Sequence, residues 1–177
     1  MTIRYIRHPN LTQADDEWCD AIAEENFHTS EDPDQAGAED CSFEVSKRFP
    51  YAWTVIKDDE KIIGYTYILP ARREMMEDFV GRNITENGLV KMINEEVTYS
   101  NCDAAYLAGA VIDKEYQNKG YAIRATIDTL VNMDKERGMK IKDLFIWPFT
   151  DSMRNMVHKA QRLAARDGRT LHIFEQG

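Results

Sequence analysis

The clearest chemical signal of the sequence is a run of six residues: Gln117, Asn118, Lys119, Gly120, Tyr121 and Ala122. The run lies between a predicted strand at 104–113 and a predicted amphipathic helix that ends near Gly138. The first backbone N–H groups of a helix have no partner within it and lie at its positive end, so such a segment can bind phosphate. Gly120 permits a close approach of the backbone, and Lys119 adds positive charge. An ordinary turn into a helix is the competing interpretation, and the spacing fits neither a dinucleotide fingerprint nor a P-loop.

Negative charge gathers in the N-terminal quarter of the chain. Between His8 and Ser46 there are twelve Asp or Glu residues and no Lys or Arg, whereas residues 47–177 hold 20 bases and 19 acids. Two interpretations stay open: a solvated helix face with an acidic loop, or a surface that attracts a cationic partner. Nucleic acid is disfavoured as the main ligand because binding phosphate needs a basic surface.

The composition limits the classes of protein to which the chain can belong. The 177 residues are 43% hydrophobic and 30% charged, which suits one globular domain over 1–177. The longest apolar run, 107–112, is too short to span a bilayer, and no signal-peptide pattern is visible. The few cysteines and histidines are scattered, so neither a disulfide framework nor a metal site is expected. We therefore expect a cytoplasmic protein with no membrane partner and no metal.

The sequence predicts alternating strands and helices around the six-residue run. Strands are predicted at 3–7, 52–57, 61–69, 104–113, 144–147 and 171–174. Helices are predicted after Thr12, with Asp15 completing a capping box, and at 121–138 and 151–166. A polar loop is predicted at 29–40. A helical excursion at 72–98 separates two strands, and it is either a structural lid on the sheet or a wall of a substrate site.

Apolar periodicity predicts which face of each helix is buried. The helix after Thr12 is expected to bury Ala14, Trp18, Ala21 and Ile22, with Asp16, Asp20 and Glu24 opposite. The helix at 121–138 is expected to bury Ile123, Ile127, Leu130 and Val131. The helix at 151–166 is expected to bury Met156, Ala160, Leu163 and Ala164.

Residues 111–122 resemble the acetyl-CoA-binding motif of the GNAT superfamily of N-acyltransferases, a strand followed by Q/R-x-x-G-x-G/A at a helix start. The predicted order of elements agrees with that family over most of the chain. The resemblance implies an α/β (α+β) three-layer fold with a mixed, mostly antiparallel central sheet and helices on both faces. It also implies direct transfer of an acetyl group from acetyl-CoA to a primary amine.

The resemblance further implies where acetyl-CoA binds. Backbone amides from Gln117 through Ala122 would surround the pyrophosphate. Ala110 and Ile112 would pair with the pantetheine arm, and a backbone N–H in the segment Ala110, Val111 and Ile112 would polarise the thioester carbonyl. The strand at 144–147 would part from the motif strand to admit the arm.

The catalytic groups depart from the family pattern. Many members carry N-x-x-A-x-x-L-Y in the penultimate helix, and alignment without gaps places Val157 and Ala164 at its Asn and Tyr positions. Asn155 is the candidate substitute for the Asn, and the Tyr acid is absent. Tyr106 stands near the position of the family's Glu base and is the other candidate catalytic residue. Some group must act as a base, because an alkyl amine is about 99.9% protonated at pH 7.

The acid-rich region corresponds to the part of the family fold that forms much of the acceptor site. This implies a cationic acceptor such as a polyamine, an aminoglycoside or a peptide amine, with Asp20, Glu24 and Glu25 as candidate binding residues. The exposed edge of the last strand could be completed by a second subunit in a homodimer. Two alternatives remain: a non-catalytic acyl-CoA-binding regulatory protein, and an acidic interaction module that binds a basic protein.

Overall fold

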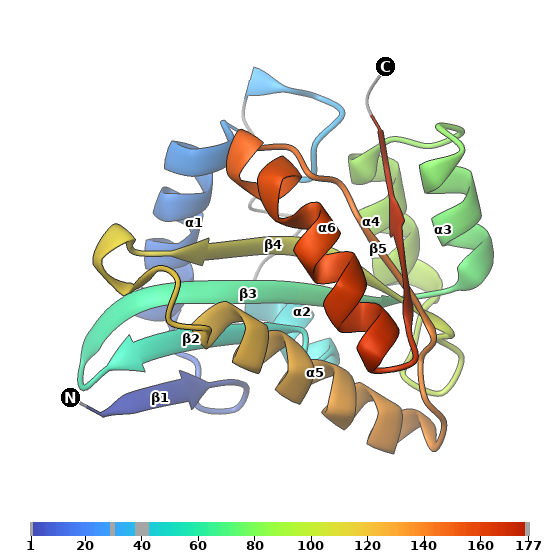
Figure 1. Ribbon diagram of the computed structural model, residues 1–177. Coiled ribbons are helices and arrows are strands. Elements are labelled where there is room, and N and C mark those ends of the chain that lie inside the picture. Colours follow the sequence, from blue (N-terminus) through green and yellow to red (C-terminus); the bar gives the residue numbers. More distant parts are fainter. Residues whose placement is uncertain (1, 29–30, 38–42, 176–177) are drawn as a thin grey trace.

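A six-stranded sheet forms the centre of the molecule (Figure 1). The computed structural model describes residues 2–28, 31–37 and 43–175, so part of the predicted loop at 29–40 lies outside the described residues. The strands lie side by side in chain order: β1 (Ile3–Ile6), β2 (Trp53–Asp58), β3 (Lys61–Ala71), β4 (Ala104–Ile112), β5 (Asp143–Ile146) and β6 (Thr170–Ile173). The β1–β2, β2–β3 and β3–β4 pairs are antiparallel, and the other two pairs are parallel. The expected mixed, mostly antiparallel sheet is confirmed.

Helices cover both faces of the sheet (Figure 1). One face carries α1 (Gln13–Phe27), α2 (Phe43–Arg48), α3 (Arg73–Val80) and α4 (Glu86–Glu96). The other carries α5 (Tyr121–Arg137), which packs on β2, β3 and β4, and α6 (Asp151–Arg166), which packs on β6. The expected three-layer arrangement is therefore confirmed. None of the described helices is both long and apolar enough to cross a membrane.

Helix α1 begins as predicted but buries a different face. Thr12 caps it, and the Asp15 side chain accepts the reciprocal hydrogen bond of the capping box. Asp15, Asp16 and Cys19 are buried, whereas Ala14 and Ala21 are exposed, so the expected apolar face is wrong at two positions. Asp15 tolerates burial because Lys57 of β2 pairs with it at 2.5 Å. Although burial acts against ionisation, the hydrogen bonds from Lys57 and Thr12 lower the pKa of Asp15.

The expected buried faces of the last two helices are also partly wrong. In α5, Ile127 and Val131 are 52% and 41% exposed, and in α6 Met156 is 51% exposed. The residues that α5 buries are Ala125, Thr129, Leu130 and Met133. Short side chains on this face let α5 approach the sheet, where the hydroxyls of Thr129 and Thr54 share a hydrogen bond of 3.4 Å. The buried face of α5 is therefore rotated from the expected one, and Leu130 belongs to both.

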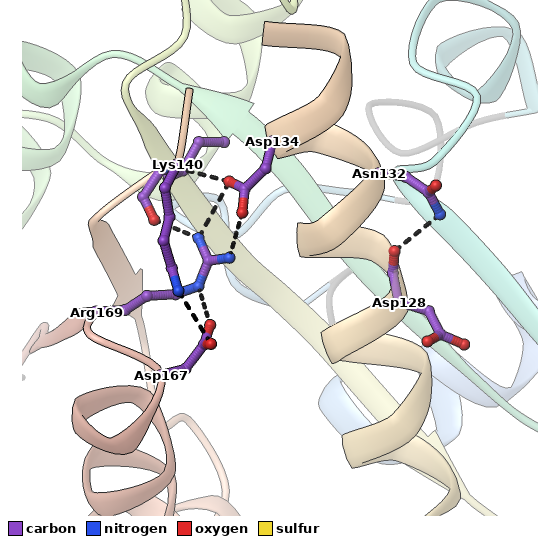
Figure 2. A network of polar contacts seen from close by, with 7 residues as sticks. Asp128, Asn132, Asp134, Lys140, Asp167 and Arg169 are labelled. Carbon is purple, nitrogen blue, oxygen red and sulfur yellow. Dashed lines mark hydrogen bonds and ion pairs between the residues drawn. The ribbon is translucent and has the colours of Figure 1, made fainter. Parts of the chain in front are cut away.

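A buried arginine fastens the end of α6 to the end of α5 (Figure 2). The Arg169 side chain is 2% exposed and donates to Asp134 Oδ2 and to Asp167 Oδ2, each at 2.6 Å. It also donates to the backbone carbonyl of Ile141, whose own N–H donates to Asp134 at 2.7 Å. Burial acts against the charge, but these carboxylates raise the pKa of Arg169. The network holds β5 and β6 in place beside the functional region described next.

Candidate active site

Strands β4 and β5 part halfway along β4. They pair only from Ala104 to Leu107, because β5 ends at Ile146 and the chain then leaves the sheet through Pro148. Beyond that point β4 still pairs with β3 on one side but has no partner strand on the other among the described residues. Exposure follows the parting: Ala104–Tyr106 is buried, whereas Ala110 is exposed although it belongs to an interior strand. The parting anticipated between these strands is thus present.

The backbone of this open segment has polar groups available. The pairing register between β3 and β4 shifts at Tyr67 and Ile68, leaving Ala108 unmatched as a β-bulge where the strands part. Asp113 N–H donates to the Ile63 carbonyl of β3 at 2.8 Å. Since successive residues of a strand alternate in the direction of their polar groups, those of Ala110 and Ile112 point away from β3. The Ile112 carbonyl accepts a bond of 3.0 Å from Gln117 Nε2, which agrees with this direction.

The loop after β4 leads to an uncapped helix start. Asn118 and Gly120 both have positive φ, 62° and 83°, which turns the chain into α5. Gly120 is the N-cap residue of α5 and makes no side-chain cap, and the first turn of the helix holds no acidic residue. A Cβ placed on Gly120 would meet no atom within 4 Å. The helix start thus has no side-chain cap and open space beside Gly120, both of which a site for an anion requires.

The six motif residues differ in their surroundings. Gln117, Asn118, Lys119 and Gly120 are exposed, and Tyr121 and Ala122 are half-buried. The Lys119 ammonium lies over the Tyr116 ring, 4.9 Å from its centroid. This contact keeps a positive charge close to the helix start.

A cavity of about 90 Å³ lies where the strands part. Its wall combines Ala108 and Gly109 of β4 with residues of α1, α4, the 35–37 segment and the chain that follows β5. Six lining residues are aromatic: Phe27, Trp53, Tyr65, Tyr67, Trp147 and Phe149. Two lining residues are acidic, Asp20 and Glu86.

Glu86 is a site residue that the sequence did not indicate. It is the first residue of α4, directly after the cap Thr85, and such an acid is ordinary at a helix start. In the structure Tyr106 Oη donates to Glu86 Oε1, and Ala36 N–H donates to Oε2 at 3.0 Å. Burial raises the pKa of Glu86, while these two hydrogen bonds act in the opposite direction. The helical excursion thus supplies a carboxylate to the wall of the cavity.

The candidate catalytic residues lie away from the cavity wall. Tyr106 is 1% exposed, with its ring stacked on Phe145 at 4.9 Å, and its hydroxyl donates to Glu86, which lines the cavity. Asn155 is exposed on α6 and is not among the lining residues. The structure therefore does not bring either side chain to the cavity.

Of the three candidate acceptor residues, all on α1, Asp20 is the one that lines the cavity. Glu24 and Glu25 do not line it, and Glu25 is exposed. Burial and the nearby charge of Asp16 raise the pKa of Asp20 to about 6. Cys19 also lines the cavity, and burial raises the pKa of its thiol so that it stays protonated at neutral pH. Among the described residues, no group of three or more His, Cys, Asp or Glu side chains could hold a metal ion.

The raised pKa of Asp20 predicts a pH-dependent stability. The folded state holds the proton more tightly than the unfolded chain, so Asp20 costs stability above pH 6 and the cost vanishes as pH falls towards 4. Asp20→Asn is expected to raise the melting temperature at pH 8 by roughly 2–4 °C, from about 1 kcal/mol after allowance for solvent screening. Melting curves at pH 8 and pH 4 test this, with Glu25→Gln as an exposed control on the same helix. A gain of equal size at both pH values would contradict the prediction.

Several solved structures contain chains similar to this one, among them the following two. The loading GNATL domain of CurA from Lyngbya majuscula is 21% identical with a TM-score of 0.49, over 75% of this chain and 58% of that chain. A ribosomal-protein-alanine N-acetyltransferase from Brucella melitensis biovar Abortus 2308 is 12% identical with a TM-score of 0.47, over 89% of each chain. No family model and no curated protein matches.

Proposed function

We propose that the protein is an N-acyltransferase that moves an acetyl group from acetyl-CoA directly to a primary amine. One observation carries the proposal: the open edge of β4 lies between the uncapped start of α5 and a cavity whose wall includes the carboxylates of Asp20 and Glu86. A long ligand with an anionic end and a reactive end fits such an arrangement. The acceptor is proposed to be cationic, because the described lining includes Asp20 and Glu86 and no Lys or Arg.

The residues present fit acetyl-CoA. The backbone N–H groups at Gly120, Tyr121 and Ala122 would hold the pyrophosphate. Polar groups of Ala110 and Ile112 that point away from β3 would bind the amide groups of the arm, as an added strand would. The thioester supplies an activated acyl group when the donor is bound. The backbone N–H of Ala110, which points away from β3, would then lie near the cavity, where a developing oxyanion needs a donor.

A carboxylate in the cavity wall can remove a proton from the ammonium form of the amine. Freeing the lone pair of an alkyl amine at pH 7 costs about 4.6 kcal/mol, from ~3.4 pK units at ~1.36 kcal/mol each. With a pKa of about 6, Asp20 is ionised at neutral pH and can accept a proton. In the transfer the N–C bond forms and the C–S bond breaks. Of the three ammonium protons one stays on the amide, one passes to the carboxylate and on to solvent, and one ends on the sulfur of CoA.

Two other functions are weighed against this one. A non-catalytic acyl-CoA-binding protein is favoured by the Tyr position of the family motif, where the chain has a buried alanine, Ala164. An acidic interaction module is less favoured, because two of the twelve clustered acids, Asp15 and Asp16, are buried. Release of CoA that depends on an amine distinguishes the enzyme from both.

Acetyl-CoA is expected to stabilise the protein against heat. At a concentration 100 times the dissociation constant, the native state gains ~2.7 kcal/mol, which is roughly 5–11 °C for a chain of this size. ATP serves as the anion control and is expected to give a much smaller shift. Equal shifts with both ligands would indicate a simple anion site, and no shift at millimolar acetyl-CoA would refute the proposal.

A further inference from the structure

We infer that the acceptor is a small monoamine carrying an aromatic group, with its ammonium bound by Glu86 and its ring bound by the aromatic wall of the cavity. The inference rests on the proposed function and narrows its acceptor from cationic amines in general. It assigns the role of binding the amine to a residue of the excursion between β3 and β4, outside the acid-rich region of the sequence.

The position of Glu86 in the fold supports its role in binding the ammonium group of the acceptor. Its carboxylate is bonded to Tyr106, which lies two residues before the bulge at Ala108 where β4 and β5 separate. An amine that attacks an acyl group at this opening must bring its nitrogen to the same place. Two donors already hold the carboxylate, from Tyr106 and Ala36, and the remaining lone pairs can accept N–H bonds. Burial raises the pKa of Glu86, but the charge of a bound ammonium favours the ionised carboxylate, and the resulting charge-assisted bond is stronger than a neutral one.

The other residues of the cavity wall favour an acceptor that carries an aromatic ring. Six aromatic side chains line the cavity, and they contact each other edge-on in two pairs, Trp53 with Tyr67 and Trp147 with Phe149. Such walls bind a flat apolar ring by stacking and by edge contacts. They also stabilise a nearby cation through the faces of the rings.

Size and charge argue against larger acceptors. A cavity of about 90 Å³ equals the liquid volume of about three water molecules, so it has room for no more than the ring of a small acceptor. The two carboxylates of the wall suffice for one ammonium group: Glu86 would bind it, and Asp20 would accept its proton. A polyamine or an aminoglycoside would place further ammonium groups against aromatic side chains, at a cost in desolvation.

An acceptor panel tests the inference. Phenylethylamine, tryptamine, spermidine, kanamycin and an alanine-terminated peptide are each offered with acetyl-CoA, and the free thiol of CoA is measured. The expected result is a kcat/KM for the two aromatic amines at least about tenfold above the others. Efficient use of spermidine or kanamycin with inert aromatic amines would overturn the inference and leave the proposed function intact. Stabilisation by acetyl-CoA without release for any amine would refute both.

A pair of variants tests the role of Glu86. Glu86→Gln is expected to raise KM for phenylethylamine by roughly 10–100-fold, since it replaces a charge-assisted bond, and to leave the thermal shift with acetyl-CoA unchanged. N,N-dimethylphenylethylamine, whose ammonium keeps one N–H donor but which cannot form a stable amide, should inhibit the wild type and lose most of this inhibition in the variant. Glu95→Gln, exposed on the same helix, is the matched control. An unchanged KM and unchanged inhibition in Glu86→Gln would remove Glu86 from the binding role.

Discussion

Gly120→Asp is expected to weaken acetyl-CoA binding by roughly 30–100-fold, or about 2–3 kcal/mol. At the N-cap position the new carboxylate accepts hydrogen bonds from the next N–H groups, which are those proposed to hold the pyrophosphate. It also places negative charge at the positive end of α5. At an acetyl-CoA concentration that stabilises the wild type by roughly 5–11 °C, a variant with a 100-fold larger dissociation constant should gain only about 1 °C.

The other end of the same helix provides the control. Gly138 is the C-cap of α5 with φ 74°, and a Cβ placed on it would likewise meet no atom within 4 Å. Gly138→Asp therefore imposes a similar backbone strain and a similar charge without touching the helix start. It is expected to keep the full thermal response to acetyl-CoA. If both variants lost that response equally, the effect would come from the helix as a whole and not from a site at Gly120.

Asp134→Ala is expected to lower the free energy of unfolding by about 3–5 kcal/mol, or roughly 6–20 °C in melting temperature. The change removes the carboxylate that accepts bonds from two nitrogens of the buried Arg169 guanidinium and leaves Asp167 as its carboxylate partner, and a buried charge that loses a partner is costly. It also removes the acceptor for the Ile141 N–H. Urea or thermal unfolding of the variant measures the loss.

An exposed ion pair shows how much of this loss depends on burial. Asp151 pairs with Arg154 at 2.8 Å, but its side chain is 92% exposed, so Asp151→Ala should cost less than about 1 kcal/mol. The double variant Asp134→Leu with Arg169→Met should be more stable than Asp134→Ala, because it removes both charges together. A double variant no more stable than Asp134→Ala would mean that the hydrogen bonds to the backbone, and not the buried charge, account for the loss.

Some of the candidate site was predictable from short stretches of sequence. The turn from β4 into α5 depends on Gly120 and on the missing cap, and both are visible within a few residues. The residues missed or misplaced depend on distant contacts. Glu86 meets Tyr106 across 20 positions and Ala36 across 50, so its own neighbours in the chain give no sign of its role.

The sequence by itself determined the order of the helices and strands, the capping box of Thr12 and Asp15, and the turn at Gly120 that leads into α5. These features depend on periodicity and on hydrogen bonds between near neighbours. Only the tertiary structure decided that α1 turns Asp16 and Asp20 inward, and that a carboxylate from α4 meets the opening between β4 and β5. The reason is physical: burial of a charge is decided by the partner that meets it, and Lys57 reaches Asp15 from a strand 42 positions away in the sequence.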